Sequence, residues 1–178
     1  NRDKGLRWVL DADLLDCFDH IHHPTLIRLV NRVVSDAFVN DLLEAWLKAG
    51  RKHRHIPSGI PQGGVISPLL CNIYLHQLDA RMTCNRWHFI RYADDFVVMT
   101  VDRSQAEQAR TIVETILTQF HLQINVRKTR VTNFDEGFTF LGVRFLDDSY
   151  HYIWQNKKVE VQGKELKTLY NYIPEFYF

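Results

Sequence analysis

Apolar and polar residues alternate along the chain in blocks whose spacing predicts secondary structure. A nearly continuous apolar run over residues 6–14 predicts a buried strand, with Asp11 and Asp13 towards its end. Two helices follow, one beginning at Pro24 and one over residues 36–49, because their apolar residues recur with helical spacing and Pro is favoured in a first turn. The apolar face of the second helix is expected to consist of Phe38, Leu42, Leu43, Trp46 and Leu47.

The middle of the chain begins with a segment rich in Pro, Gly and basic residues over residues 51–64, which predicts a loop. Ser67 can cap a helix and Pro68 suits its first position, so a helix is expected to start there. The later elements are predicted as strands at 87–92 and 96–101, a helix at 104–120, and strands at 122–126, 130–134, 138–145 and 150–154.

The order of these elements predicts the fold class. A strand, helices, a hairpin, a helix and a strand form the split βαβ pattern of a ferredoxin-like sheet. We therefore expect an α+β fold, with an antiparallel sheet, helices on one face and an appended C-terminal β-hairpin. A chain of 178 residues is expected to form a single domain.

Composition narrows the possible functions. The 22 Lys and Arg residues are balanced by 21 Asp and Glu residues, so contact with nucleic acid must rest on local patches. The densest patch is the basic loop at residues 51–55, whose Arg51, Lys52 and Arg54 are candidates for contacts with phosphates, or else form a solvated loop. Three cysteines are too few for a disulfide framework, which favours an intracellular location, and no apolar run reaches the ~20 residues of a membrane span.

Acidic residues stand at the ends of predicted strands that neighbour each other in a split βαβ sheet. Asp13 ends the first strand, and Asp94 and Asp95 lie in the hairpin turn. Carboxylates gathered in this way repel one another, and a hard divalent cation such as Mg²⁺ removes the repulsion. Alternatively, Asp94 and Asp95 simply form a turn, in which Asp is common. The apolar residues on both sides of the pair favour the metal site, because a solvated turn needs no such setting.

Several motifs together resemble those of reverse transcriptases, in the form found in group II intron-encoded enzymes and their bacterial relatives. Residues 92–95, Tyr-Ala-Asp-Asp, are similar to the catalytic box of that family, and residues 13–19 resemble its first catalytic motif, an Asp followed closely by an aromatic residue. Residues 59–75 are close to the group II motif that contacts template and nucleotide, and residues 140–142, Phe-Leu-Gly, resemble the primer grip. The motifs occur in the family's order, so the predicted sheet is expected to be a polymerase palm.

The resemblance implies a role for each acidic residue. Asp13, Asp94 and Asp95 would be catalytic and would hold two Mg²⁺ ions, for which Mn²⁺ can substitute. The backbone carbonyl of Leu14 would complete the coordination of one ion. The reaction implied is the transfer of nucleotides from deoxynucleoside triphosphates to a primer.

The resemblance also implies residues that bind the nucleotide. Phe18 stands where the family has a flat ring that excludes a 2′-hydroxyl, although a core position is the alternative. Gln62 would contact the nucleotide or template base, and Gly63 would let the backbone approach closely. Lys128 would lie near the triphosphate and could protonate the leaving pyrophosphate, or else is a solvated basic residue.

The implied partners are an RNA template, a DNA primer and deoxynucleoside triphosphates. Intron RNA is an additional partner in the group II case, and the implied location is the bacterial cytoplasm. Phe140, Leu141 and Gly142 would hold the primer. Few residues precede the first strand and no helical thumb pattern follows the last one, so we expect a palm without the N-terminal fingers segment and thumb, and weak primer extension by this chain alone.

Other functions remain open at this point. The first is an RNA-binding module of the maturase type that lacks independent polymerase activity. The second is a palm-fold nucleotidyl cyclase, which is disfavoured because its hairpin turn would hold a pair of glycines, whereas the turn here reads Ala93, Asp94 and Asp95. A zinc site formed by Cys17 and the neighbouring histidines is also disfavoured, since the spacing is not that of a structural zinc site.

Overall fold

A computed structural model describes residues 5–50, 55–154 and 157–162 of the chain. Its main sheet consists of β1 (Trp8–Asp13), β2 (His88–Tyr92), β3 (Asp95–Thr100) and β4 (Arg130–Asn133). The strands lie in the order β2-β3-β1-β4, and every neighbouring pair is antiparallel. This is the arrangement expected from the split βαβ pattern, and it confirms the predicted α+β palm fold.

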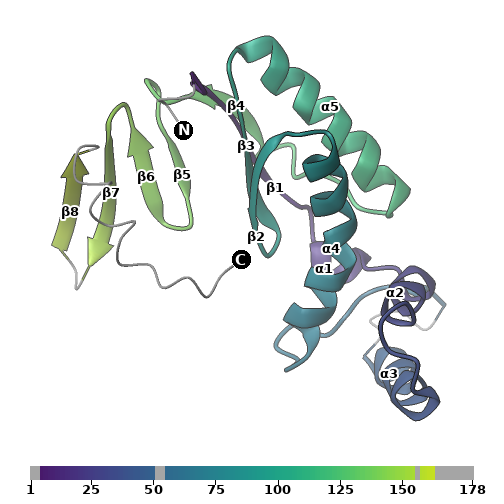
Figure 1. The fold of residues 1–178 in the computed structure, drawn as a ribbon. Helices are drawn as coiled ribbons and strands as arrows, with labels where there is room; N and C mark the ends of the chain where they lie inside the picture. Colours follow the sequence, from purple (N-terminus) through teal and green to yellow (C-terminus); the bar gives the residue numbers. More distant parts are fainter. Residues whose placement is uncertain (1–4, 51–54, 155–156, 163–178) are drawn as a thin grey trace.

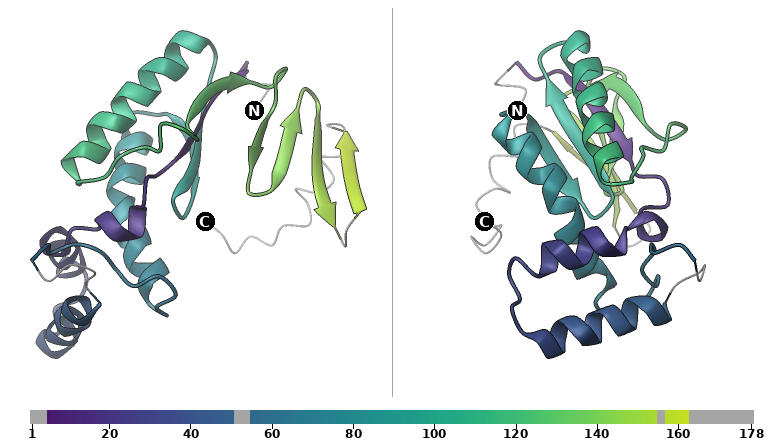
Figure 2. Two further views of the ribbon diagram at one scale, coloured as in Figure 1. Left: turned by 180° about the vertical axis from the view of Figure 1, so that it is seen from behind. Right: turned by 90° about the vertical axis from the view of Figure 1, so that its right-hand side faces the viewer.

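Helices cover one face of the main sheet. The helices are α1 (Cys17–His20), α2 (His23–Val30), α3 (Ala37–Ala49), α4 (Ser67–Cys84) and α5 (Arg103–Gln119). Figure 1 shows α4 and α5 side by side against the sheet, and the views in Figure 2 show α2 and α3 grouped beyond one end of α4. The prediction of helices on one face is confirmed.

Local signals set the ends of two helices, within one residue of the predicted bounds. The Asp36 carboxylate accepts a hydrogen bond from the Val39 N–H at the start of α3, and Gly50 follows the end of this helix. At the start of α5, Asp102 accepts a bond from the Gln105 N–H in the same way. The caps at Asp36 and Asp102 were not predicted, although each depends only on residues that are neighbours in the sequence.

The two faces of the main sheet bury different sets of residues. Side chains alternate along a strand, so Leu10 and Ala12 of β1 point towards the helices and pack in the larger core. Val9 of β1 and Val97 of β3 point to the opposite face, where a smaller core also contains Phe138. The acidic residues of β1, at odd positions like Val9, therefore lie on the face without helices.

A second antiparallel sheet follows the main one. It contains β5 (Phe138–Phe140), β6 (Val143–Leu146), β7 (Ser149–Trp154) and β8 (Lys157–Gln162), in that order. The prediction of an appended hairpin and of one strand over residues 138–145 was wrong, because a tight turn at Leu141 and Gly142 divides that segment. Leu141 is apolar, so the pattern hid the turn, and the polar composition of β8 concealed a further strand.

Three more local predictions were wrong. Ser67 does not cap α4: it lies inside the helix, and its hydroxyl donates to the Pro61 carbonyl. Phe38 and Leu42 of α3 are exposed, because Leu43 and Leu47 form the buried face of that helix. Residues 122–126 form an isolated bridge between Leu14 and Ile124 in place of a strand.

Within the described residues, no helix is long and apolar enough to cross a membrane.

Candidate active site

Two of the predicted catalytic acids face each other across neighbouring strands. Asp13 at the end of β1 is the register partner of Asp95 at the start of β3. Asp94 lies in the two-residue turn between β2 and β3, and its carbonyl accepts a hydrogen bond of 3.3 Å from the Leu14 N–H. The sheet therefore brings together, at one end, the segments of β1 and of the hairpin that carry the predicted catalytic acids.

Basic and polar side chains surround the carboxylate of Asp13. Lys128 Nζ lies 3.1 Å from Asp13 Oδ2, and the Asn125 amide nitrogen lies 3.4 Å from the same oxygen. The backbone N–H of Asn125 also donates to the Asp13 carbonyl at 2.7 Å. The Asp13 carboxylate raises the pKa of the Lys128 ammonium, so this side chain is a cation at the mouth of the site.

Asp11 is a further acidic residue of the site that the sequence reasoning did not include. It lies two positions before Asp13 and therefore on the same face of β1, and Arg130 Nε lies 3.1 Å from its carboxylate. Burial raises the pKa of Asp11 despite the nearby guanidinium. Side chains two residues apart in a strand point to the same face, and this alternation would have been the signal for including Asp11.

The surroundings of Asp95 oppose the ionisation of its carboxyl group. Burial raises its pKa, and the negative charges of Asp11, Asp13 and Asp94 raise it further. A hydrogen bond from the backbone of Leu141 acts in the opposite direction. Leu141 and Gly142 form the tip of the β5–β6 hairpin, both with positive φ, so the predicted primer-grip turn touches the predicted catalytic acid Asp95.

We expect Asp95→Asn to raise the thermal stability of the protein at pH 7. The pKa of Asp95 is raised above its ordinary value of 3.8, so ionisation costs more in the folded state than in the unfolded chain. The cost is absent below pH 3.8, grows as the pH rises through the folded-state pKa, and is complete above it. Melting temperatures of both proteins measured from pH 3 to pH 8 should therefore diverge with rising pH, and parallel curves would contradict the electrostatic account.

The donor chemistry of the site suits a divalent cation. Carboxylate oxygens and a backbone carbonyl are the ligands that Mg²⁺ prefers, and crowded negative charge opposes the ionisation of Asp95. Among the described residues, no three Asp, Glu, His or Cys side chains are grouped closely enough to enclose a metal ion. The Lys128 ammonium is instead the cation next to Asp13. The types of ligand atom therefore suit a divalent cation, but the side chains are not arranged to coordinate one in this structure.

The loop before α4 is held against the segment that follows Asp13. The Ile60 N–H donates to the Phe18 carbonyl at 2.8 Å, and the Gly59 N–H donates to the Ile21 carbonyl at 2.9 Å. A cavity of about 490 Å³ opens between the two segments, lined by Asp19, His20, Gly50, Ile56, Ser58, Gly59, Ile60, Pro61 and Gln62. Two motifs that are far apart in the sequence thus form one surface.

The predicted nucleotide-binding residues differ in exposure. Phe18 is partly buried and packs against the larger core, whereas Gln62 is exposed beside the cavity. The backbone of Gly63 has a φ of 80°, which glycine adopts without strain. Apart from its chain neighbours, no residue lies within 4 Å of the place where a Cβ would be, so the space above this glycine is open. Gly64, by contrast, is packed against Trp46 and Ser67, where a side chain would clash.

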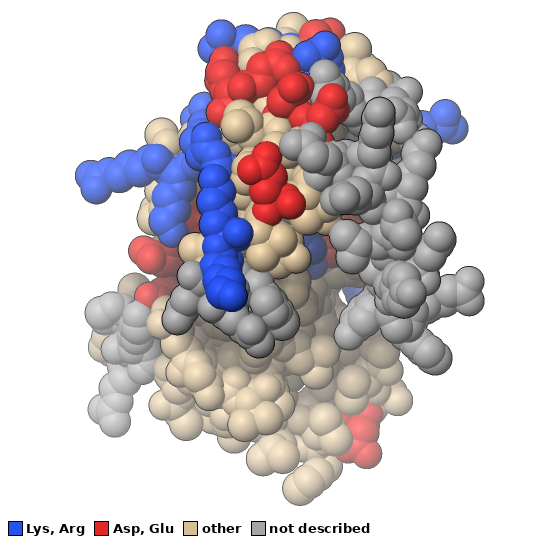
Figure 3. Space-filling view, turned by 90° about the vertical axis from the view of Figure 1, so that its left-hand side faces the viewer, with Lys and Arg blue, Asp and Glu red and all other residues tan. Residues whose placement is uncertain are grey.

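The charges around the site are mixed. The predicted contacts at Arg51, Lys52 and Arg54 lie outside the described residues. Figure 3, which views the molecule from the side of the second sheet, shows a column of Lys and Arg side chains next to a group of acidic ones. The exposed basic residues of the second sheet are Arg144, Lys157 and Lys158. A nucleic acid would therefore meet local basic strips and no uniformly positive face on the side shown.

The histidines and cysteines near α1 have other partners. His23 bonds the Gly59 carbonyl at 2.7 Å and His22 bonds the Thr25 hydroxyl at 3.0 Å. The thiols of Cys17 and Cys71 are buried and 3.8 Å apart. The hydrogen bond with Cys71, together with burial, raises the pKa of the Cys17 thiol, so it is protonated at neutral pH and acts as a packing group.

Comparison with known proteins supplies the family. Residues 1–145 match the family described as "Reverse transcriptase (RNA-dependent DNA polymerase)". The chain belongs to the reverse transcriptase family. It is 34% identical to Protein YkfC of Escherichia coli over 79% of this chain, and 47% identical to the group II intron-encoded protein LtrA of Lactococcus lactis over 42% of this chain. These findings confirm the resemblance inferred from the motifs.

Solved structures of similar fold include telomerases. The telomerase of Candida tropicalis, truncated from its C-terminal domain, matches with a TM-score of 0.65 and 15% identity, over 82% of this chain and 35% of that one. At this identity the likeness shows the fold alone. The reverse transcriptase chain described here spans 47% of YkfC and 13% of LtrA, so it corresponds to a part of each relative.

Proposed function

We propose that this chain is the catalytic palm of an RNA-directed DNA polymerase, which adds deoxynucleotides to a DNA primer on an RNA template. The observation that carries the proposal is the pairing of Asp13 with Asp95 beside the turn that holds Asp94. In a chain of the reverse transcriptase family, this is where acids for nucleotidyl transfer are expected. A group II intron or a related bacterial retroelement is the proposed source, with the cytoplasm as its location.

Asp13, Asp94 and Asp95 would hold two divalent cations, Mg²⁺ or its substitute Mn²⁺, with the carbonyl of Leu14 as a further ligand. When bound, these ions stabilise negative charge on the attacking and leaving oxygens of the transferred phosphate. The raised pKa of Asp95 supports the assignment, because neighbouring cations favour its ionised form. Lys128 would leave Asp13 and place its proton near the departing pyrophosphate.

Two residues are proposed to select the nucleotide. Phe18 lies on α1, five residues after Asp13, and its ring is partly buried against the larger core, which would hold it in a fixed orientation. Gln62 is exposed beside the 490 Å³ cavity, where it can contact a base, and Gly63 has open space for a strand to approach. These positions support discrimination against a 2′-hydroxyl by Phe18 and contact with the template by Gln62.

The primer would lie against the hairpin tip formed by Leu141 and Gly142, with Phe140 buried beneath it. Leu141 is half-exposed and its backbone bonds the Asp95 carboxylate, so a primer end held there would be next to the acids. Basic residues at Arg51, Lys52 and Arg54 are proposed to contact the phosphates of the nucleic acid.

The test is single-nucleotide addition by the purified protein at low ionic strength. A DNA primer annealed to an RNA template should be extended by one deoxynucleotide in the presence of Mg²⁺ or Mn²⁺ and not in the presence of a chelator. Low salt is chosen because contacts with phosphates weaken steeply as salt rises. RNA affinity is measured on the same samples.

RNA binding without any metal-dependent addition would reject the polymerase proposal and favour the RNA-binding module. Extension on a DNA template but not on an RNA template would retain the metal chemistry and reject the proposed template. Asp13→Asn is the matched variant, and it should bind RNA as well as the unaltered protein does while losing addition.

A further inference from the structure

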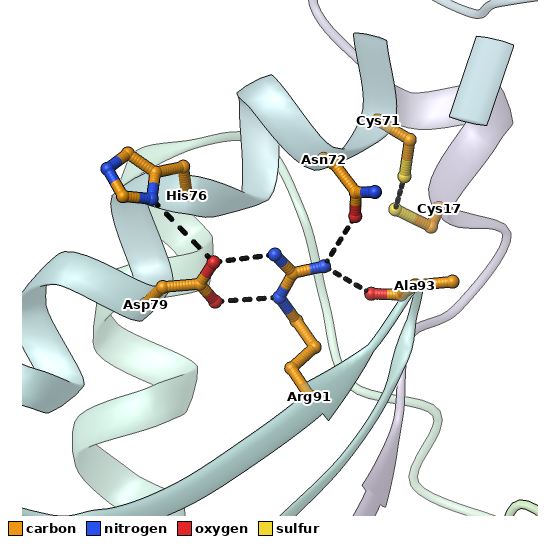
Figure 4. Close-up of polar contacts among 7 residues, drawn as sticks. All are labelled: Cys17, Cys71, Asn72, His76, Asp79, Arg91 and Ala93. Atoms are coloured by element: carbon orange, nitrogen blue, oxygen red, sulfur yellow. Dashed lines mark hydrogen bonds and ion pairs between the residues drawn. The ribbon is translucent and has the colours of Figure 1, made fainter. Parts of the chain in front are cut away.

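An arginine between the main sheet and α4 makes four side-chain hydrogen bonds. Arg91, on β2, donates through Nε and Nη2 to the two carboxylate oxygens of Asp79, at 2.7 and 2.6 Å. Its Nη1 donates to the Asn72 side-chain oxygen at 3.0 Å and to the Ala93 carbonyl at 2.7 Å. Figure 4 shows the guanidinium between α4 and the end of the hairpin. Its side chain is only 9% exposed, and its bonds to Asp79 and to the Ala93 carbonyl are partly shielded from water.

The carbonyl that Arg91 holds belongs to a turn that alanine does not favour. Tyr92 pairs with Asp95, so the hairpin turn consists of Ala93 and Asp94. Ala93 has a φ of 52°, in the left-handed region where glycine or asparagine is usual in such turns. Because the Cβ of alanine disfavours this conformation, an outside contact must help to stabilise it.

The same turn presents the catalytic acids. Asp94 follows Ala93 directly, and its carbonyl bonds the Leu14 N–H at the end of β1. Asp95 is the next residue and pairs with Asp13. A change in the backbone at Ala93 would therefore move both acids of the hairpin relative to Asp13.

We propose that Arg91, anchored to α4 by Asp79 and Asn72, is a positioning residue that holds the left-handed turn at Ala93 and so sets where Asp94 and Asp95 lie. The inference rests on the proposed function only for its catalytic consequence. α4 begins next to the loop that would bind template and nucleotide, so the network also ties the acids to that loop. Asp79 balances the charge of Arg91, and the exposed His76 lies 3.8 Å from its carboxylate.

The decisive measurement is the rate of amide hydrogen exchange in the Arg91→Lys protein, monitored by NMR. Lysine keeps the positive charge but lacks the planar guanidinium, so it cannot bond Asp79 and the Ala93 carbonyl at the same time. The Leu14 amide, which bonds the Asp94 carbonyl, should exchange at least about tenfold faster. The Leu122 amide, which bonds the Leu117 carbonyl away from the turn, should be unchanged.

Ala93→Gly in the Arg91→Lys background should restore much of the protection at Leu14, because glycine adopts positive φ without the alanine penalty. Mn²⁺ affinity, measured by electron paramagnetic resonance, should fall about tenfold in Arg91→Lys and recover in the double variant. Arg110→Lys is the matched control, since Arg110 pairs with Glu114 one turn further along α5.

Unchanged exchange at Leu14 would overturn the inference, and so would equal acceleration at Leu14 and Leu122, which would mean that Arg91 only stabilises the fold as a whole. If Arg91→Lys does not fold, Asp79→Asn provides the same comparison with a smaller change. Failure of the unaltered protein to bind Mn²⁺ would count against the proposed metal site, while exchange at Leu14 would still decide the role of Arg91.

Discussion

Asp94→Asn is expected to lower the rate of nucleotide addition by about 100-fold or more, while leaving the fold intact. Asparagine has nearly the same shape as aspartate, and the backbone bond from Leu14 to the Asp94 carbonyl does not need the carboxylate. The loss of one negative charge would weaken the hold on the proposed divalent cations, which stabilise the transferred phosphate. Single-turnover primer extension at saturating nucleotide measures the change.

The matched control for this variant is Asp41→Asn on the exposed surface of α3, which removes the same charge far along the chain from the site. It should extend the primer at the rate of the unaltered protein. Addition at near the original rate by Asp94→Asn, with Mg²⁺ dependence unchanged, would show that the acids of the hairpin do not hold the metal.

Phe18→Ala is expected to have two effects, because its ring packs against the larger core and is also proposed to exclude a 2′-hydroxyl. Removal of a core phenylalanine lowers the free energy of unfolding by about 3 kcal/mol. If the ring also excludes the 2′-hydroxyl, the preference for deoxynucleotides over ribonucleotides should fall by about tenfold or more. Denaturant unfolding and the ratio of kcat/KM for the two nucleotides measure these effects separately.

Phe18→Leu separates the two roles more cleanly than Phe18→Ala. Leucine fills part of the core but lacks the flat ring, so stability should fall less while sugar discrimination is still lost. A folded Phe18→Leu protein with unchanged discrimination would leave Phe18 as a core residue alone.

The parts of the fold that depend on local signals were predictable. The cap at Asp36 and the stop at Gly50 involve neighbours in sequence, and the order of elements was enough to place β1 beside β3. The exposure of Phe38 was not predictable, because an apolar residue on a helix is buried only if another element packs against it. The turn at Leu141 was not predictable for a related reason. Leucine is usually buried in a strand or helix, whereas the hairpin requires a positive φ at this position.

In the candidate site, too, the residues within contiguous motifs were predictable, whereas the contacts between distant elements were not. The acids at Asp13, Asp94 and Asp95 were recognisable from sequence because their motifs are contiguous and stand at strand ends. The contact of Asp11 with Arg130 and the network of Arg91 depend on how distant elements pack. Alternation along the strand would have included Asp11, but no pattern in the sequence links Arg91 to a helix that precedes it.

The central place of β1 has a consequence for how the protein folds. Within the described sheets, β1 pairs only with β3 and β4, and both are synthesised after α4. A chain emerging from the ribosome thus carries an apolar strand with two open edges until the hairpin is complete, which exposes it to wrong pairing. Pairing between segments so distant in sequence slows folding. Asp13 and Asp95 meet only when β1 pairs with β3, so the candidate catalytic site forms together with the main sheet and is absent until the hairpin has been made.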